Sequence, residues 1–426
     1  MGGPAQGTEG SPADGGAAAR SGADRADGTL GAVLAAALEA SHQAAPEDLP
    51  RLVDAWGRAL GLTGAEVFLA DLQQRMLVPL PAPEQRVPTE AMDVDGTLAG
   101  HAYRTERARI APGPPRTGWI PLVDGIERIG VLRVGFTGPA GTPTGTPVGL
   151  LRERARALAS LVTLILVSKG TIGDVIVRTV RTRPMTLQAE LLWAFVPPRT
   201  IGTRHVTSSA VLEPAYDVAG DAFDHTLAGD TLHLAVVDAM GHDLASGGAS
   251  AAALAACRST RRADGSLADI TEAIDTTLTR WIPDRLLTAV LADLDTITGR
   301  LTWVNCGHPP PLLIREGRVV PGALERAAHL PLGIGEHRPA PVHRARLQPG
   351  DRVLIHTDGV TEARSAAGDL FGEQRLVDSV VRTTAAGDPA PEALRRLVHA
   401  LLTHRDHRLQ DDATVLLVEW HPDREP

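Results

Sequence analysis

The chain has 426 residues, a formal net charge of -9 and 43% hydrophobic residues, which is sufficient for two or three globular domains. This acidic balance excludes a general nucleic-acid-binding protein, because such a protein needs a basic face to neutralise phosphates. The two cysteines are far apart and form no CxxC pattern, which excludes a disulfide framework and a zinc site and favours a reducing, cytoplasmic location.

Residues 1–28 contain no Leu, Ile, Val or Phe. Such a segment cannot bury enough apolar surface to offset the entropy lost on ordering, so we predict a disordered tail. No signal peptide is expected, because this end lacks an apolar core segment. The longest apolar run, residues 158–167, is about half the length that spans a bilayer, so no membrane segment is expected either.

Residues 29–168 combine helical and strand patterns. Apolar residues recur at helical spacing from Leu30 to Leu38 and from Leu49 to Leu60, which predicts two amphipathic helices. Asp124-Gly125 predicts a hairpin turn. A short helix is expected near residues 97–104, and strands are expected at residues 66–70, 76–80, 119–123 and 128–136.

This order of elements, closed by the hairpin WIPLVDGIERIGVLRVGF, resembles a GAF sensor domain over residues 29–168. GAF domains often bind a small molecule between the sheet and its helices, so the resemblance implies a small-molecule ligand and a regulatory role. The stretch contains no cysteine to attach a bilin. A purely structural or dimerising role is the alternative.

A Gly-, Pro- and Thr-rich linker at residues 138–147 precedes a further helical pattern, and residues 169–185 are expected to form a helical linker. The apolar positions with roughly heptad spacing are Leu158, Leu161, Ile165, Ile172 and Val175. This spacing favours a homodimer through the helix. Packing of the first half of the helix on the preceding sheet is the alternative.

The stretch VAGDAFDHTLAGDTLHLAVVDAMGHD, residues 218–243, predicts a β-hairpin with an acid beside a glycine at each end. Residues 227–230 have the composition of a turn, and the apolar run 232–237 has the length of a strand. We therefore expect Asp221 and Asp238 near opposite ends of the paired strands. Two carboxylates held in this way could share a cation.

Two further acidic positions have similar settings. Asp358 follows the expected strand 353–356, and Asp411-Asp412 precedes the expected strand 414–419. A single acid at a strand end is usually only a turn residue. Together, however, the four positions predict a convergent site, and oxygen ligands select a hard ion, Mg²⁺ or Mn²⁺, rather than zinc.

The rest of this half alternates between strands and helices. Ser266 is expected to cap a helix with Asp269 at the reciprocal position. The other expected helices are residues 245–262, 373–382 and 391–404, and the other expected strands are residues 286–294, 301–305 and 312–315. This arrangement predicts two packed antiparallel sheets flanked by helices, an α/β sandwich.

Six motifs in this order, AGDAFD, VVDAMGHD, NCGHPPPLL, LPLGIG, HTDGVTEAR and QDDATVLLVEW, resemble the SpoIIE-type branch of the PPM metal-dependent serine/threonine phosphatases. The resemblance covers roughly residues 186–420 and implies an α-β-β-α sandwich, with a phosphatase domain at residues 186–422. Ala219, Val237 and Asp243 stand where this branch usually has glycine.

The resemblance also implies roles for single residues. Asp238 would bridge two metal ions, Mn²⁺ or Mg²⁺, and the backbone carbonyl of Ala239 would help to hold one of them. Asp358 and Asp411 would hold the other ion, and Asp221 would meet the metals through water. His242 is a candidate proton donor to the leaving oxygen, with a surface position as the alternative.

The function implied is hydrolysis of phosphoserine or phosphothreonine by a metal-activated water, with a phosphorylated anti-anti-sigma protein as substrate and the GAF-like domain as regulator. One alternative is a catalytically inactive phosphatase-like scaffold, and another is a two-metal nucleotidyl cyclase. Nucleotide binding has no support, because neither GxxxxGK[ST] nor GxGxxG is present. Cys306 and His308 are not expected to act as a nucleophile pair, because residues this close on one strand end rarely face each other.

Overall fold

The computed structural model describes residues 15–82, 89–112, 116–136, 148–335, 338–385, 388–404, 409 and 411–421. They form two compact units. The first comprises Met1–Ala70, Met76–Asp124 and Ile129–Val180, and the second comprises Asp71–Arg75, Gly125–Arg128 and Arg181–Pro426. The expected linker at residues 138–147 lies outside the described residues. The expected domain boundaries at residues 28, 168 and 185 stay predictions.

The first unit is built on one six-stranded antiparallel sheet with the order β3-β2-β1-β6-β5-β4. Its strands are β1 (Ala65–Ala70), β2 (Met76–Pro79), β3 (Met92–Asp93), β4 (Arg109–Ile110), β5 (Thr117–Asp124) and β6 (Glu127–Gly135). Its helices are α1 (Gly15–Gln43), η1 (Pro46–Asp48), α2 (Leu49–Ala59), α3 (Leu98–Thr105), α4 (Val148–Lys169) and α5 (Asp174–Val180). The four predicted strands and the predicted short helix are confirmed.

The expected tail is only partly tested. Residues 1–14 lie outside the described residues, whereas α1 begins at Gly15, so residues 15–28 are helical rather than structureless. The absence of large apolar residues indicates that this stretch buries little surface. Alanine and arginine nevertheless have high helix propensity, which the argument from burial did not include.

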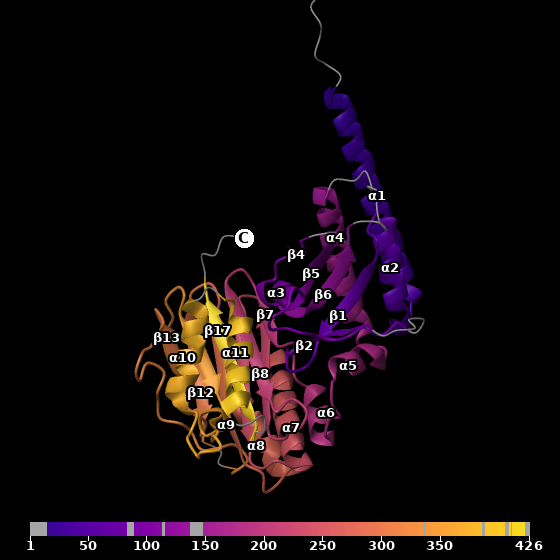
Figure 1. Ribbon diagram of the computed structural model, residues 1–426. Helices are drawn as coiled ribbons and strands as arrows, with labels where there is room; N and C mark the ends of the chain where they lie inside the picture. The colour runs from indigo at the N-terminus through magenta and orange to yellow at the C-terminus, as the bar shows by residue number, and fades with distance from the viewer. Residues whose placement is uncertain are drawn as a thin grey trace, which may run out of the picture. The chain divides into compact units, whose positions relative to one another are not determined.

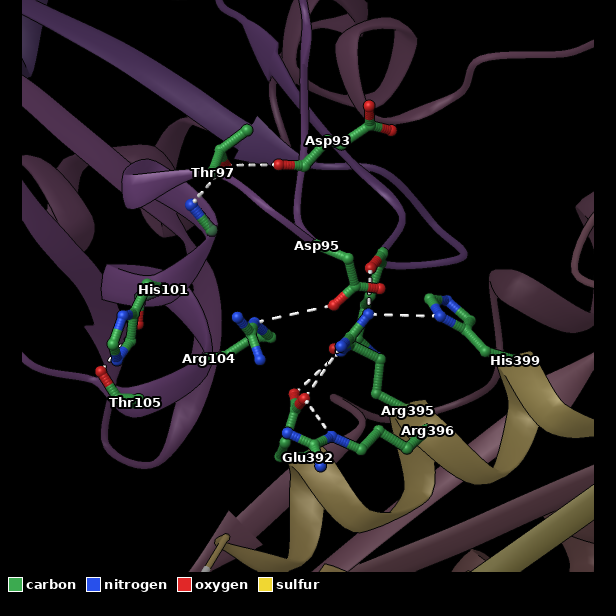
Figure 2. A network of polar contacts seen from close by, with 12 residues as sticks. Asp93, Asp95, Thr97, His101, Arg104, Thr105, Glu392, Arg395, Arg396 and His399 are labelled. Carbon is green, nitrogen blue, oxygen red and sulfur yellow. Dashed lines mark hydrogen bonds and ion pairs between the residues drawn. The ribbon is translucent and has the colours of Figure 1, made fainter.

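Side chains on the two faces of this sheet enter different cores. Val67 and Leu69 of β1 pack with residues of α2 and α4, whereas Phe68 packs with Tyr103 of α3. This alternation is the period of two that a strand imposes. Thr97 caps α3, since its hydroxyl accepts from the N–H of Gly100 and donates to the carbonyl of Asp93 (Figure 2).

The helical linker is broken. α4 and α5 meet at a bend of 107°, and no single helix among the described residues is long and apolar enough to cross a membrane. Leu158 and Ile165 are buried in the core of the first unit. The first half of the helix therefore packs on the sheet, as the alternative had it, and the homodimer stays a prediction.

The second unit contains two antiparallel sheets. The five-stranded sheet has the order β15-β12-β11-β10-β9 and the six-stranded sheet has the order β14-β13-β16-β17-β8-β7. The strands are β7 (Thr200–Gly202), β8 (Val206–Glu213), β9 (Asp221–Ala228), β10 (Thr231–Ala239), β11 (Leu287–Asp295), β12 (Arg300–Cys306), β13 (Leu312–Arg315), β14 (Arg318–Val319), β15 (His343–Arg346), β16 (Arg352–His356) and β17 (Ala413–Trp420). The helices are α6 (Leu187–Trp193), α7 (Leu244–Arg262), α8 (Leu267–Trp281), α9 (Asp358–Thr361), α10 (Gly372–Ala385) and α11 (Ala390–His404).

The layers of this unit follow from the two faces of β17. Leu416 and Val418 enter the core shared with the five-stranded sheet, whereas Val415 and Leu417 pack against α10 and α11. On the other side, α7 contacts β9 and β10. Figure 1 shows α10 and α11 over the sheet that contains β17. The predicted helix-sheet-sheet-helix sandwich is confirmed for this unit.

Local signals also act as predicted. Ser266 and Asp269 form a capping box at the start of α8. In α11, Glu392 accepts hydrogen bonds from Arg395 and Arg396, three and four residues along the helix (Figure 2). Burial disfavours a charged Glu392, but the hydrogen bonds and charges of Arg395 and Arg128 together outweigh it and hold the pKa of this carboxyl below its ordinary value.

Candidate metal centre

The hairpin of β9 and β10 sets the position of the first two acids. Gly229 has a φ of 56° in the tight turn, so the strands pair in a register that puts Asp221 directly opposite Asp238. The expectation of opposite ends was wrong, because in an antiparallel hairpin the start of the first strand faces the end of the second. Both carboxylates therefore lie at the open end of one ladder.

Asp221 is buried, and one of its carboxylate oxygens accepts hydrogen bonds of 2.7 Å from the hydroxyls of Thr357 and Thr414. These threonines lie at the end of β16 and in β17, so Asp221 joins the two sheets. Burial, and after it the charges of Asp238 and Asp412, raise the pKa of Asp221 well above its ordinary value.

Asp238 is half-buried, and its charge is opposed from several sides. Burial, followed by the charges of Asp358, Asp411 and Asp412, raises its pKa to about 7. All three of these neighbours are acidic. Three acids that are more than a hundred residues distant in sequence thus act on Asp238.

Asp358 begins α9, directly after β16. Partial burial, and then the charges of Asp411 and Glu362, raise the pKa of Asp358. Gly359 makes this approach feasible, since a Cβ at that position would lie 1.9 Å from the carbonyl oxygen of Asp412. The glycine of the HTDG motif therefore lets the start of α9 lie against the segment before β17.

Asp412 has a larger role than its sequence context indicated. One of its carboxylate oxygens accepts from the backbone N–H groups of Ala219, Gly220 and Asp221, at 2.9, 2.6 and 3.1 Å. Burial nevertheless raises the pKa of Asp412. This side chain fixes the backbone that leads into β9, whereas its neighbour Asp411 is exposed.

The donor set fits hard divalent cations. Among the described residues, no group of three or more His, Cys, Asp or Glu side chains is arranged so that it could hold a metal ion without other ligands. Mg²⁺, however, keeps several waters and takes one or two carboxylates. Asp238, Asp358 and Asp411 could hold such ions, and the three charges that raise the pKa of Asp238 are all negative. The carbonyl of Ala239 approaches Gly220, where a Cβ would lie 2.5 Å from it.

Arg285 brings a positive charge to this end of the hairpin. It precedes β11, and its guanidinium donates to the carbonyl of Met240 at 3.2 Å and to the carboxylate of Asp243 at 2.6 Å. Asp243 also caps α7 by accepting from the N–H of Ser246. Sequence reasoning missed Arg285, because nothing in the sequence connects it to a loop more than forty residues away.

His242, His308 and Cys306 are the other residues that the sequence offered for catalysis. His242 is exposed, which agrees with the surface position given as its alternative. The ring of His308 bonds the hydroxyl of Thr288 at 2.7 Å, and burial lowers its pKa to about 3, so the imidazole stays neutral. Burial, and then the charge of Asp275, raises the pKa of Cys306 to about 12. A thiol with this pKa is not a nucleophile at neutral pH.

Cys306→Ser is therefore expected to leave turnover largely intact. The thiol is buried and protonated, so its loss should affect packing rather than chemistry. Steady-state hydrolysis of a phosphoserine peptide, with circular dichroism as a check of folding, measures the effect. A folded variant that has lost more than about a hundredfold in turnover would favour a cysteine mechanism, since that is the size expected for an essential catalytic group.

Residues 228–421 match the family model described as Stage II sporulation protein E (SpoIIE). The matched segment contains Asp238, Asp358 and Asp411, whereas Asp221 lies outside it. The match supports the predicted resemblance to PPM phosphatases for this part of the chain. The GAF-like resemblance of residues 29–168 stays a prediction.

Several known proteins are similar to parts of the chain. Protein IcfG of Synechocystis sp. (strain ATCC 27184 / PCC 6803 / Kazusa) is 28% identical over 126 residues, which are 29% of this chain and only 19% of that protein. The RsbU and RsbW domains of Rv1364c from Mycobacterium tuberculosis share 25% identity at a TM-score of 0.45, covering 54% of this chain and 63% of that one. The catalytic domain of the serine/threonine phosphatase PstP, solved with two manganese ions, shares 17% identity at a TM-score of 0.37, covering 51% and 99%.

Proposed function

We propose that the second unit is a metal-dependent protein phosphatase that hydrolyses phosphoserine or phosphothreonine. The observation that carries the proposal is the grouping of acids at one end of the hairpin, where Asp221 lies directly opposite Asp238 and the charges of Asp358, Asp411 and Asp412 help to raise the pKa of Asp238. Such a concentration of like charge is unfavourable without a cation. The SpoIIE family match over residues 228–421 supports the same activity.

Two bound divalent cations would activate a water at neutral pH and neutralise charge on the phosphoryl group. Asp238, Asp358, Asp411 and the carbonyl of Ala239 would hold them. Asp221 would orient water from its position opposite Asp238, because Thr357 and Thr414 fix its carboxylate. No side-chain nucleophile is needed, which agrees with the protonated state of Cys306.

The proposed substrate is a phosphorylated protein of the anti-anti-sigma type, as the family resemblance implies, in a cytoplasmic signalling pathway. The alternative is an inactive phosphatase-like scaffold. It is disfavoured by the presence of all four predicted acids. A scaffold would not need to maintain carboxylates whose charges oppose one another.

Hydrolysis of a synthetic phosphoserine peptide by the full chain is expected to stop in EDTA and to recover on addition of Mn²⁺ or Mg²⁺, because oxygen ligands supply the whole site. Phosphate release measures the activity. Full activity in EDTA would exclude the metal-dependent reaction. Absence of activity with every divalent cation, in a protein that still binds Mn²⁺, would favour the scaffold.

For the first unit, the proposed role is regulation by a small molecule. A cavity of about 850 Å³ opens beside α2 and the sheet, within the usual size range of ligand sites. Its lining includes Trp119 and two ion pairs, Arg58 with Asp54 and Arg133 with Glu66.

A regulatory ligand in this cavity would contact Trp119, so a cell extract of small molecules that changes activity is expected to change tryptophan fluorescence as well. Trp119→Phe should remove most of that fluorescence change. An unchanged fluorescence response in the variant would place the ligand elsewhere.

A further inference from the structure

Four large apolar side chains lie exposed on the loop after Asp238, on the loop that lies against Arg285 and at the end of α8, and we call them the apolar rim. They are Met240, Leu244, Trp281 and Ile334, with exposed fractions of 56%, 46%, 70% and 47%. A single exposed apolar residue needs no explanation, but a group of them around one feature marks an interaction site.

Met240 and Leu244 lie on the loop that leaves β10 directly after Asp238. The loop is held in place, since Arg285 donates to the carbonyl of Met240 and to Asp243. Gly241 has a φ of 104°, and a Cβ there would lie 2.9 Å from the guanidinium of Arg285. The carbonyl of Met240 and the carboxylate of Asp243 thus have partners within the fold, whereas the side chains of Met240 and Leu244 stay exposed.

Ile334 belongs to the LPLGIG motif, whose role the metal centre does not explain. The motif is fixed on both sides of Ile334, because the N–H groups of Gly333 and Gly335 both donate to Asp275 of α8. Leu332 forms a bridge with Leu287 at the start of β11. A Cβ at Gly333 would lie 2.3 Å from the carbonyl of Arg285, so this loop lies against the residue that holds Met240.

Trp281 ends α8. Because α7 and α8 are consecutive, joined by a short connection and packed on each other, they run antiparallel. The end of α8 is therefore at the same end of the helix pair as the start of α7, where Leu244 lies. Figure 1 shows the two helices side by side in the second unit. The ring of Trp281 makes one ring contact among the described residues, with the guanidinium of Arg280, which lies 4.9 Å from the ring centroid.

We propose that the apolar rim is the docking surface for the phosphorylated protein substrate, and that it binds apolar side chains flanking the phosphoserine. This inference rests on the proposed function. A phosphoserine that reaches Asp238 must bring its neighbouring residues over Met240, which is two positions further along the chain. Exposed Met and Trp suit this task, since Met adapts to different shapes and Trp is a frequent centre of binding energy.

A second copy of the chain is the competing occupant. A permanent dimer through Met240 would cover the end of the hairpin where Asp238 and Asp358 lie, and would block a phosphoprotein from reaching them. Beside Met240, Arg285 is already paired with Asp243. The four exposed apolar side chains therefore favour apolar residues in the partner.

The test uses the full chain and three substrates: p-nitrophenyl phosphate, a phosphoserine peptide with leucines on both sides, and the same peptide with serines in their place. The variant is Trp281→Ser with Ile334→Ser. The matched control is Ile297→Ser, because Ile297 is 51% exposed but lies in the turn after β11, at the opposite end of that strand from Arg285.

The wild-type protein is expected to prefer the leucine-flanked peptide. The double variant should lose about tenfold in kcat/KM for that peptide, mainly through KM, which corresponds to the loss of one substantial binding contact. Hydrolysis of p-nitrophenyl phosphate should stay unchanged, which also shows that the variant is folded. Ile297→Ser should behave as the wild type.

Equal kcat/KM for the two peptides in the wild type, or an unchanged preference in the double variant, would overturn the docking proposal while leaving the phosphatase intact. A wild-type dimer that becomes a monomer in the double variant, measured by sedimentation, would overturn it in favour of a second copy. Failure of the wild type to hydrolyse even p-nitrophenyl phosphate with Mn²⁺ would remove the proposed function and the docking proposal with it.

Discussion

Asp238→Asn is expected to lower turnover of a phosphoserine peptide by more than about a hundredfold, since loss of even a hydrogen-bond partner of a metal ligand typically costs 10- to 100-fold. The substitution keeps the size of the side chain but removes the negative charge that would lie between two cations. Steady-state kinetics across a Mn²⁺ titration measure the loss and separate weaker metal binding from slower chemistry.

Asp230→Asn is the matched control for this change. Asp230 is exposed in the turn at the far end of the same hairpin, so the variant makes the same chemical replacement without reaching the acids. It is expected to retain wild-type turnover. Similar losses in both variants, or near wild-type turnover in Asp238→Asn, would mean that the metal centre is on other residues.

Asp238→Asn lowers turnover, but it should raise the stability of the fold when metal is removed. The pKa of Asp238 is raised from 3.8 to about 7, so between these values the folded state binds more protons than the unfolded state. The contribution of Asp238 to the free energy of unfolding then falls as pH rises through this window. In EDTA, the stability of Asp238→Asn relative to the wild type should therefore increase as the pH rises from about 4 to about 7.

Buried histidines such as His225 and His308 have lowered pKa values and also change stability with pH, but equally in both proteins. The difference between the two melting curves therefore reports the charge of Asp238, together with its effect on the pKa of Asp221. A difference that is constant across the pH range would show that the acids do not repel one another in the metal-free fold.

Asp412→Ala is expected to cost at least about 3 kcal/mol in the free energy of unfolding and to abolish activity. The substitution leaves the buried N–H groups of Ala219, Gly220 and Asp221 without their acceptor, at about 1–3 kcal/mol for each unsatisfied group. Urea unfolding monitored by circular dichroism measures the loss.

Two comparison variants separate this structural role from metal binding. Asp412→Asn keeps a side-chain carbonyl oxygen as acceptor and should be destabilised much less. Asp411→Ala removes the exposed neighbour. Among the hydrogen bonds of the described residues, the Asp411 carboxylate accepts only from the N–H of Asp412. The variant should therefore weaken Mn²⁺ binding with little change in stability. Equal stability of Asp412→Ala and the wild type would contradict the assigned hydrogen bonds.

The elements of the second unit were predictable because each carries a strong local signal. The apolar run 232–237 and the Ser266 cap specify a strand and a helix start without tertiary information. The convergence of Asp358 and Asp411 on Asp238 was also predictable, because strand ends in two packed sheets meet at a shared edge. The register of the first hairpin required geometry: the turn at Gly229 decides that Asp221 faces Asp238.

The contacts that sequence reasoning missed are those between distant segments. Asp412 and Arg285 act on backbone groups of other segments, Asp412 on residues 219–221 and Arg285 on Met240. Every residue type except proline has the same backbone N–H and carbonyl, so no pattern of residue types predicts these partners. The break between α4 and α5 had a signal in Gly170 and Gly173, but the heptad-like spacing outweighed it.

Isothermal titration of the metal-free full chain with Mn²⁺ tests the central claim most directly, because it counts the ions without depending on a substrate. The account predicts two Mn²⁺ ions per chain for the wild type, the loss of at least one of them in Asp238→Asn, and unchanged binding in Asp230→Asn. Wild-type binding of both ions by Asp238→Asn, or no binding by the wild type, would contradict it.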